Sequence, residues 1–194
     1  MPKLGMEPIR RAALVKATIA EVGHAGSLDV TVAQIARRAG MSTALAHHYF
    51  GSKEQMFLAA MRHILTLYGA EVRGALVAAD GPRERLDGIV RASFAPSSFR
   101  HETVAAWLSF YVLAQTVPQA RRLLRIYQGR LRSNLVHALR PLAGNAAEAI
   151  AHGTGALIDG VYIREALSES APDGRAAAAL VLAHLAALTG RAGA

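Results

Sequence analysis

Three aromatic side chains share one face of a helix that the sequence predicts over residues 103–116. Trp107, Phe110 and Tyr111 stand at positions i, i+3 and i+4, which lie on one side of a helix. The whole chain has only one Trp, five Phe and five Tyr, so three on one face are unusual. Such a face suits a quaternary ammonium ion, which offers no hydrogen-bond donor and binds through cation–π and dispersion forces. An ordinary hydrophobic core is the alternative, and the sequence leaves both open.

Later helices supply candidate partners for a ligand of this kind. Tyr127 and Tyr162 could complete the walls of an aromatic pocket, and Asp159 or Glu102 could balance a positive charge. Asp159 could instead be a structural acid inside a helix, because buried acids are usually paired. The candidate ligand-binding residues are therefore Trp107, Phe110, Tyr111, Tyr127, Asp159 and Tyr162.

A second group of residues has the spacing of a helix, a tight turn and another helix. Thr31 and Gln34 fit a capping box, in which the two side chains satisfy free backbone amides at a helix start. Apolar residues then recur at helical spacing until Gly40, which predicts a left-handed stop. Ser42 can cap a second helix over residues 43–50. Small residues at the start of that helix would allow close approach to the edges of DNA bases.

This region resembles the N-terminal signature of TetR-type repressors over about residues 8–60. The resemblance is carried by the run Thr31-Val-Ala-Gln-Ile-Ala-Arg-Arg-Ala-Gly-Met-Ser-Thr-Ala-Leu-Ala-His-His-Tyr-Phe-Gly-Ser-Lys-Glu54, where the turn glycine, capping residues, aromatic end and lysine fall in order. It implies an all-helical homodimer in which each subunit joins a DNA-binding head to a ligand-binding body. Ala44 departs from the family, which often has Gly there, and this difference can change the base contacts.

The resemblance also implies which residues meet DNA. Thr31, Ser42, Tyr49 and Lys53 match positions that contact phosphates, and hydroxyls, a helix N-terminus and an ammonium suit that role. The helix over residues 43–50 would read bases, since a threonine methyl and histidine edges suit thymine methyls and purine acceptors. The candidate DNA contacts are Thr31, Arg38, Ser42, Thr43, Ala44, Leu45, His47, His48, Tyr49 and Lys53.

Several residues of this region also have a structural interpretation. Leu45, Tyr49 and Phe50 could simply form the core of a small helical head. Arg38 could stabilise the C-terminal end of its own helix through the helix dipole. The sequence alone does not separate these roles from DNA contact.

Basic residues at the start of the chain predict a further DNA contact. Lys3, Arg10 and Arg11 are expected to form a basic arm before the first helix, which could follow a DNA backbone or enter a minor groove. A solvated charge cluster is the alternative. The chain as a whole has 22 Lys and Arg against 14 Asp and Glu, a net charge of +8 that favours anionic partners. The arginines between residues 121 and 140 have no predicted role beyond a solvated face.

A closer resemblance within the family reaches the whole chain, although it is weak over residues 63–100. The similarity is to the choline-responsive repressors of glycine-betaine synthesis, and its motifs are Met1-Pro-Lys-Leu-Gly-Met6, Ile9-Arg-Arg11, Ala106-Trp-Leu-Ser-Phe110, Arg130-Leu-Arg-Ser-Asn-Leu-Val136 and Ala156-Leu-Ile-Asp-Gly160. It implies a repressor of choline-to-glycine-betaine genes that choline releases from DNA. The alternative is a TetR-type repressor of another regulon, such as efflux, with a different lipophilic or cationic ligand.

Glycine and proline positions divide the chain into about nine helices, and no stretch alternates with the period of a β-strand. Gly23 and Gly26 predict the end of the first helix, and three short helices are expected before longer ones. A capping box at Ser52–Gln55 opens the fourth. The predicted fold is all-α and TetR-like. It has a three-helix head with a helix-turn-helix in residues 1–51 and a helical ligand-binding and dimerisation body in residues 52–194.

The last two predicted helices, residues 146–169 and 174–188, are rich in Ala and Leu. Gly153, Gly155 and Gly160 would permit close approach, so two helices from each subunit could form a four-helix interface. The resulting homodimer would place two reading helices about 34 Å apart on one face of a duplex. The sequence therefore predicts double-stranded DNA with a near-palindromic operator as the partner.

The composition argues against several other classes of protein. The chain has no cysteine, its histidines are not spaced as metal ligands on a helix, and it lacks nucleophile-elbow and phosphate-loop motifs. An enzyme is therefore not expected, and neither is a metal or cofactor. A protein that coats DNA without sequence preference is the remaining rival, but coating does not require a long apolar body. Without a recognisable signal peptide or spanning segment, the sequence predicts a cytoplasmic location and no membrane partner.

Overall fold

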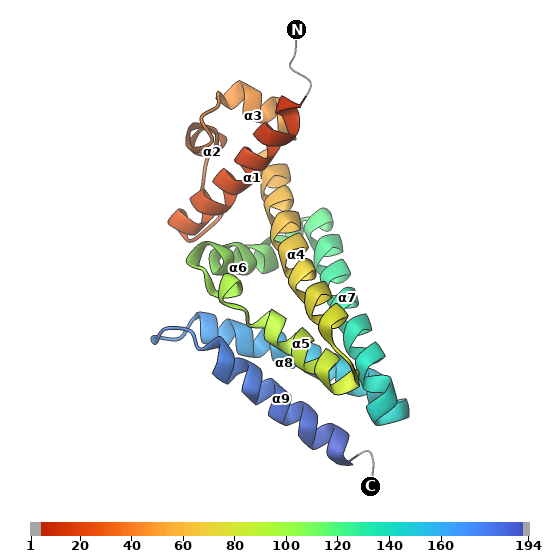
Figure 1. Ribbon diagram of the computed structural model, residues 1–194. Coiled ribbons are helices and arrows are strands. Elements are labelled where there is room, and N and C mark those ends of the chain that lie inside the picture. The colour runs from red at the N-terminus through yellow and green to blue at the C-terminus, as the bar shows by residue number, and fades with distance from the viewer. Residues whose placement is uncertain (1–4, 192–194) are drawn as a thin grey trace. The chain divides into compact units, whose positions relative to one another are not determined.

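The computed structural model describes residues 5–191, and all of the regular elements in that range are helices (Figure 1). The α-helices are α1 (Met6–Ala25), α2 (Val32–Arg38), α3 (Thr43–Phe50), α4 (Lys53–Ala78), α5 (Pro82–Ser93), α6 (His101–Thr116), α7 (Pro118–Ala143), α8 (Ala147–Ala166) and α9 (Gly174–Arg191). Single 3₁₀ turns occupy Pro96–Phe99 and Gly144–Ala146. The predicted all-α class and the number of α-helices are confirmed for these residues.

The first helix is longer than predicted. The expectation of three short helices at the start is wrong for α1, which spans 20 residues and exceeds both α5 with 12 and α6 with 16. Gly23 lies inside α1, and the helix ends only at Gly26, whose φ of 65° is the left-handed conformation of a C-terminal stop. One of the two glycines therefore ends the helix, and the other has a role in packing.

The chain forms two compact units. The first runs from the start of the described chain to Thr66 and adds Arg100–Leu123, and the second comprises Leu67–Phe99 and Leu124–Ala194 as far as the structure describes it. The helices α4 and α7 each contribute residues to both units.

In the first unit, α1 packs against α2 and α6, and α2 packs against α3. Its core includes Leu14 and Val22 of α1, Ile35 of α2 and Ala46 of α3, all of which are fully or almost fully buried. Burial of each of the larger side chains contributes roughly 1.5–3 kcal/mol to folding. The two short helices α2 and α3 and the turn between them are therefore held by a core shared with α1 rather than by helix propensity alone.

In the second unit, α5 and α8 both pack against α9. Ile89, Leu135, Ile158 and Val181 supply its buried core from α5, α7, α8 and α9. Gly174 at the start of α9 is required for this packing, because a Cβ there would lie 2.3 Å from the carbonyl oxygen of Phe94. The start of α9 predicted at residue 174 and the Ala-rich character of α8 and α9 are both present in the structure.

Candidate nucleic-acid interface and ligand site

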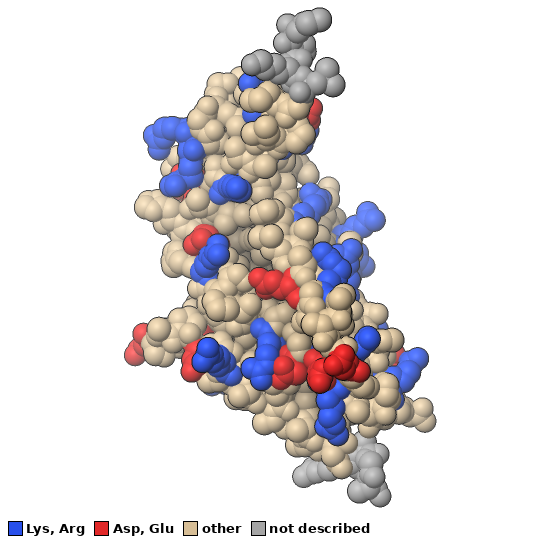
Figure 2. Space-filling model, viewed as in Figure 1, with Lys and Arg blue, Asp and Glu red and all other residues tan. Residues whose placement is uncertain are grey.

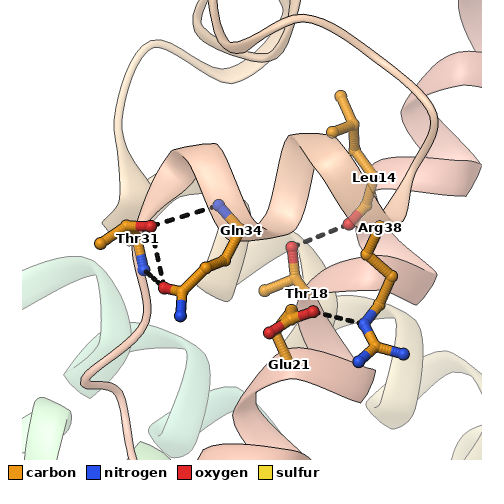
Figure 3. A network of polar contacts seen from close by, with 6 residues as sticks. All are labelled: Leu14, Thr18, Glu21, Thr31, Gln34 and Arg38. Atoms are coloured by element: carbon orange, nitrogen blue, oxygen red, sulfur yellow. Dashed lines mark hydrogen bonds and ion pairs between the residues drawn. The ribbon is translucent and has the colours of Figure 1, made fainter.

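The capping box that begins α2 is present as predicted. The Thr31 hydroxyl oxygen accepts a hydrogen bond from the Gln34 amide at 3.2 Å, and the Thr31 amide donates to the Gln34 side-chain oxygen at 2.7 Å (Figure 3). The turn after α2 has Gly40 at φ 67°, and the Met41 amide donates to the Ala36 carbonyl. Ser42 then caps α3 by accepting a bond from the Leu45 amide at 3.2 Å. The predicted helix, glycine turn and helix are therefore confirmed.

The helix α3 presents a polar and small-residue face to solvent. Thr43, Ala44, His47 and His48 are exposed, whereas Ala46 is completely buried. The side chains of Leu45, Tyr49 and Phe50 are half-buried. On the visible surface of the three-helix region, at the top of Figure 2, basic side chains outnumber acidic ones. The small and polar face of α3, within a region richer in basic than in acidic side chains, suits a helix that enters a DNA groove.

The predicted basic arm is corrected by the structure. Arg10 and Arg11 lie inside α1, which begins at Met6, so they do not precede the first helix; Lys3 lies outside the described residues. The guanidinium of Arg11 lies 5.6 Å from the ring centroid of Tyr49 and 5.3 Å from that of Phe50. Arg10 donates to the Tyr49 hydroxyl at 3.4 Å. The sequence missed this because Pro8 is acceptable in the first turn of a helix and does not delay its start.

Two further predicted DNA contacts, Arg38 and Lys53, also have partners within the unit. The Arg38 Nε atom lies 2.5 Å from a carboxylate oxygen of Glu21, an α1 residue that is buried (Figure 3). This ion pair ties the end of α2 to α1 and neutralises a carboxylate that would be costly to bury alone. Lys53 donates to the carbonyl of Leu28 at 3.1 Å, which leaves two of its three ammonium hydrogens for other partners. Sequence reasoning missed Glu21, because nothing in its local spacing links it to Arg38.

The three aromatic residues of α6 lie together in the first unit. The Trp107 ring centroid is 5.8 Å from that of Phe110 at an edge-to-face angle of 66°, and 5.9 Å from that of Tyr111. Phe110 is fully buried, Trp107 is nearly so, and Tyr111 is half-buried. The helix α6 thus carries a continuous aromatic face.

A second aromatic group, in the second unit, includes a carboxylate. The Tyr127 hydroxyl donates to an Asp159 carboxylate oxygen at 3.1 Å, and the Tyr68 ring meets the Tyr127 ring edge-on at 5.8 Å. The Tyr68 hydroxyl is hydrogen-bonded to the hydroxyl of Ser93 at 3.1 Å. Burial raises the pKa of Tyr68, and the nearby carboxylates of Asp159 and Glu71 raise it further. Two phenol rings and a carboxylate therefore lie close together in a mostly buried environment.

Sequence reasoning missed Tyr68. It lies on α4, 59 residues before Tyr127, and no local spacing links the two aromatic residues. Asp159 also lines a groove of about 750 Å³ between α7 and α8, together with Gln128, Leu131 and Gly155. This groove gives the Asp159 carboxylate a route to solvent.

The other two candidates for the ligand site have different partners. Tyr162 stacks on Phe99 with centroids 5.3 Å apart, and its hydroxyl donates to the Ser98 carbonyl at 2.8 Å. Burial raises the pKa of Tyr162 well above its usual value. Glu102 lies where α6 crosses α1, and a Cβ on Gly23 would come within 2.7 Å of the Glu102 Cα atom.

Three arginines of α7 have specific partners, which the sequence did not predict. Arg121 donates from Nε to the Ala114 carbonyl at 3.1 Å and from Nη2 to the Gln115 carbonyl, so it caps the C-terminal end of α6. Arg132 and Arg140 both lie near the carboxylate of Glu148, at the first turn of α8. These residues connect successive helices.

The described part of the chain contains no group of three His, Cys, Asp or Glu side chains that could hold a metal ion. It also contains no helix long and apolar enough to cross a bilayer.

Comparison with known proteins places the chain in a family. Residues 14–60 match the bacterial regulatory proteins of the tetR family, and residues 82–190 match the C-terminal part of BetI-type transcriptional repressors. A curated HTH-type transcriptional regulator BetI from Brucella suis biovar 1 (strain 1330) is 54% identical over 187 residues, covering 96% of this chain and 94% of the relative. The chain belongs to the TetR family and is of the BetI type. It is therefore a DNA-binding transcriptional repressor that responds to a small molecule.

Solved structures agree on the fold. A transcriptional regulator from Pseudomonas aeruginosa PAO1 superposes with a TM-score of 0.84 at 26% identity, over 97% of this chain and 93% of the other. A regulator from Saccharomonospora viridis, solved in complex with choline, superposes with a TM-score of 0.80 over 90% of this chain and 94% of the other. Because its identity is 22%, this second likeness concerns the fold alone. The all-α TetR fold is confirmed.

Proposed function

We propose that this BetI-type repressor controls genes for the conversion of choline to glycine betaine and that choline releases it from DNA. The observation that carries the proposal is the group formed by Tyr68, Tyr127 and Asp159. A trimethylammonium cation has no hydrogen to donate, so its recognition requires aromatic faces and a negative charge. Two phenol rings beside a carboxylate meet both requirements. The fold neighbour from Saccharomonospora viridis that was solved with choline supports the same ligand class.

The aromatic face of α6 is the second candidate for contact with the ligand. Trp107 offers the strongest cation–π surface of the common side chains, and Phe110 and Tyr111 extend it. Tyr162 is the remaining candidate, although its hydroxyl is bonded to Ser98. Variants in each group test their contributions separately.

For DNA, we propose that residues 1–51 act as the head and residues 52–194 as the ligand-binding and dimerisation body. Phosphates would be met by Thr31, Ser42, Tyr49 and Lys53, with Arg38 beside them, and bases by α3 through Thr43, Ala44, Leu45, His47 and His48. The exposure of Thr43, Ala44, His47 and His48 supports this division of labour, because those side chains form the free face of α3.

For a ligand that contacts the aromatic face of α6, the proposed route to DNA is the contact of α6 with α1. These helices pack in one unit, at the crossing of Gly23 and Glu102, and α6 bears Trp107. A displacement of α6 would therefore move α1 directly, and the long helix α4 would carry a share of the movement. A coupling of about 1–3 kcal/mol is sufficient for release.

We further propose that α8 and α9 form the interface of a homodimer. Small residues recur at solvent-exposed positions of both helices, namely Ala149, Gly153, Ala156 and Gly160 on α8 and Ala176, Ala179, Ala183 and Ala187 on α9. Leu180, which is 55% exposed, adds a large apolar side chain to that face of α9. A two-fold pairing of such faces gives a four-helix interface and a near-palindromic operator.

Sedimentation velocity tests the proposed interface. Ala183→Glu places a charge on the exposed face of α9 and is expected to yield a folded monomer, because a carboxylate is costly to bury in an apolar contact. Ala70→Glu, on the exposed side of α4, is the matched control and should leave the dimer intact. A dimer of unchanged affinity for Ala183→Glu would contradict this interface.

Fluorescence anisotropy on DNA from upstream of the protein's own gene, with and without millimolar choline, tests the ligand. Choline is expected to weaken specific binding. Asp159→Asn keeps an oxygen for the Tyr127 bond but removes the charge, so the choline needed for half-release should rise roughly tenfold. Asp87→Asn, which removes the carboxylate of a solvent-exposed ion pair with Arg91, is the matched control.

The outcomes separate the candidate ligands. Specific binding that ignores choline but responds to another lipophilic cation would indicate a repressor of a different regulon. A normal response to choline in Asp159→Asn, combined with loss of response in Trp107→Ala, would move the cation site to α6. If DNA binding fell uniformly with salt and showed no sequence preference, the operator-specific function itself would be wrong.

A further inference from the structure

The imidazole of His47 is held in one orientation by the backbone. His47 is exposed on α3, and its Nδ1 atom lies 2.9 Å from the carbonyl oxygen of Gly51. In return, the Gly51 amide donates to the His47 carbonyl at 2.7 Å. Gly51 has a φ of 76°, a conformation that turns the chain back toward the helix end and that glycine adopts readily. The ring is therefore held at the end of α3 by one hydrogen bond, to a carbonyl that the backbone bond between Gly51 and His47 keeps in place.

This hydrogen bond also fixes the proton. A carbonyl oxygen can only accept, so the hydrogen in the contact belongs to Nδ1 of His47. A neutral imidazole has one N–H, and the other nitrogen, Nε2, is then an acceptor with no hydrogen to donate. The free end of the His47 side chain therefore requires a donor as its partner.

The chemistry of DNA limits which groups can donate a hydrogen bond to Nε2 of His47. Phosphate oxygens only accept hydrogen bonds, so Nε2 of a neutral His47 has no favourable contact with the backbone of DNA. In the major groove, guanine presents two acceptors, and thymine presents an acceptor and a methyl group. Donors are found only on the amino groups of adenine, at N6, and cytosine, at N4.

We propose that His47 is a specificity-determining residue that accepts a hydrogen bond from the amino group of an adenine or a cytosine in each half of the operator. The inference rests on the proposed placement of α3 in the major groove. It reverses the expectation from sequence that the histidine edges meet purine acceptors, because the bond to Gly51 uses the only N–H group of the neutral ring.

His48 provides the comparison within the same helix. His48 is also exposed, but its ring contacts a different neighbour, the Tyr49 ring, edge-on at a centroid distance of 5.4 Å. Replacement of His48 by alanine therefore removes a histidine from α3 without touching the bond between His47 and Gly51.

The experiment begins with selection of an operator from random duplexes by the full-length protein in a mildly alkaline buffer, which keeps imidazoles neutral. Each adenine of the selected site is then replaced by purine, and each cytosine by 2-pyrimidinone, so that only the exocyclic amino group is lost. Binding of the wild type, His47→Ala and His48→Ala to every duplex is measured by fluorescence anisotropy.

At one position in each half-site, the wild type is expected to lose roughly 5- to 150-fold in affinity on loss of the amino group, the range for one specific base contact. His47→Ala should bind that analogue and the natural base equally, while His48→Ala should retain the penalty. The proposal would be overturned if His47→Ala bound all duplexes more weakly by the same factor and still lost affinity whenever an amino group was removed. That result would indicate a contact with the DNA backbone. A preference for guanine at the position that His47→Ala relaxes would also overturn it. If the wild type selects no operator from the random duplexes, the placement of α3 in the major groove is wrong, and the proposed role of His47 is wrong as well.

Discussion

The crossing of α1 and α6 depends on the absence of a side chain at one position. A Cβ atom on Gly23 would lie 2.4 Å from the Cβ and 2.7 Å from the Cα of Glu102. Carbon atoms in contact prefer about 3.5–4.0 Å, so the two helices would have to separate by about 1 Å or more. A backbone atom, unlike the end of a flexible side chain, cannot give way by changing its rotamer. We therefore predict that Gly23→Ala is destabilising.

The magnitude follows from two opposing effects. Alanine in a helix is favoured over glycine by about 1 kcal/mol, and forcing an extra carbon into a packed contact costs about 1–3 kcal/mol, occasionally more. The backbone contact at Gly23 falls at the upper end of that range, so the net loss should be about 1–2 kcal/mol. Gly74→Ala is the matched control, because Gly74 lies inside α4 with no heavy atom within 4 Å of its missing Cβ. It should gain about 0.5–1 kcal/mol.

Urea unfolding followed by circular dichroism, at one fixed protein concentration, measures both variants. The expected result is a lower midpoint for Gly23→Ala, a higher midpoint for Gly74→Ala and an unchanged slope for both. If the same Gly→Ala substitution lowers stability at position 23 and raises it at position 74, the packing of α1 against α6, and not helix propensity, determines the stability change at Gly23. A Gly23→Ala protein as stable as Gly74→Ala would refute the close contact of α1 and α6.

Two further predictions concern local polar contacts. Thr31→Ala removes the hydroxyl that caps α2 and should lower the free energy of unfolding by about 1 kcal/mol in the absence of DNA. Thr66→Ala is the control, since the exposed Thr66 hydroxyl donates to Arg62 within its own helix, and it should cost less. Equal effects in thermal unfolding would contradict the importance of the cap. The pKa of Tyr162 is raised by burial, so its contribution to stability is complete below the ordinary phenol pKa of about 10 and is lost as the pH rises beyond it. Tyr162→Phe should be less stable than the wild type at neutral pH, because it lacks the bond to Ser98, yet it should lose less stability between about pH 9 and 11. The alkaline loss that remains in this variant is assigned to Tyr68, whose pKa is also raised. An identical alkaline loss of stability in both proteins would refute the role of Tyr162.

The parts of the structure that the sequence predicted are those in which the interacting groups are close along the chain. Thr31 and Gln34 are three residues apart, as are Ser42 and Leu45, and Gly40 needs only its own backbone conformation to end α2. Hydrogen bonds of this kind are formed within one turn of helix, so their spacing can be read directly. The bounds of α3 were therefore predicted to the residue.

The parts that sequence reasoning missed depend on contacts between distant segments. Nothing near Gly23 in the chain shows that Glu102 will lie against it, so a glycine that permits packing looked like a helix stop. In the same way, Tyr68 joins Tyr127 only after α4 and α7 have packed. Tertiary packing overrides local signals at such positions, and they include residues that we propose contact the ligand.

The close contact at Gly23 also bears on how a signal could pass to DNA. Where large flexible side chains fill a helix crossing, a small shift of one helix can be absorbed by new rotamers. At Gly23 the neighbour is the backbone of Glu102, so α1 has no such buffer against movement of α6. Packed interfaces tend to switch between discrete arrangements rather than deform continuously. Gly23→Ala, which forces the two helices apart, should therefore change the choline concentration needed for half-release as well as stability. Gly74→Ala adds a carbon that meets no neighbour, so it should change that concentration less than Gly23→Ala does.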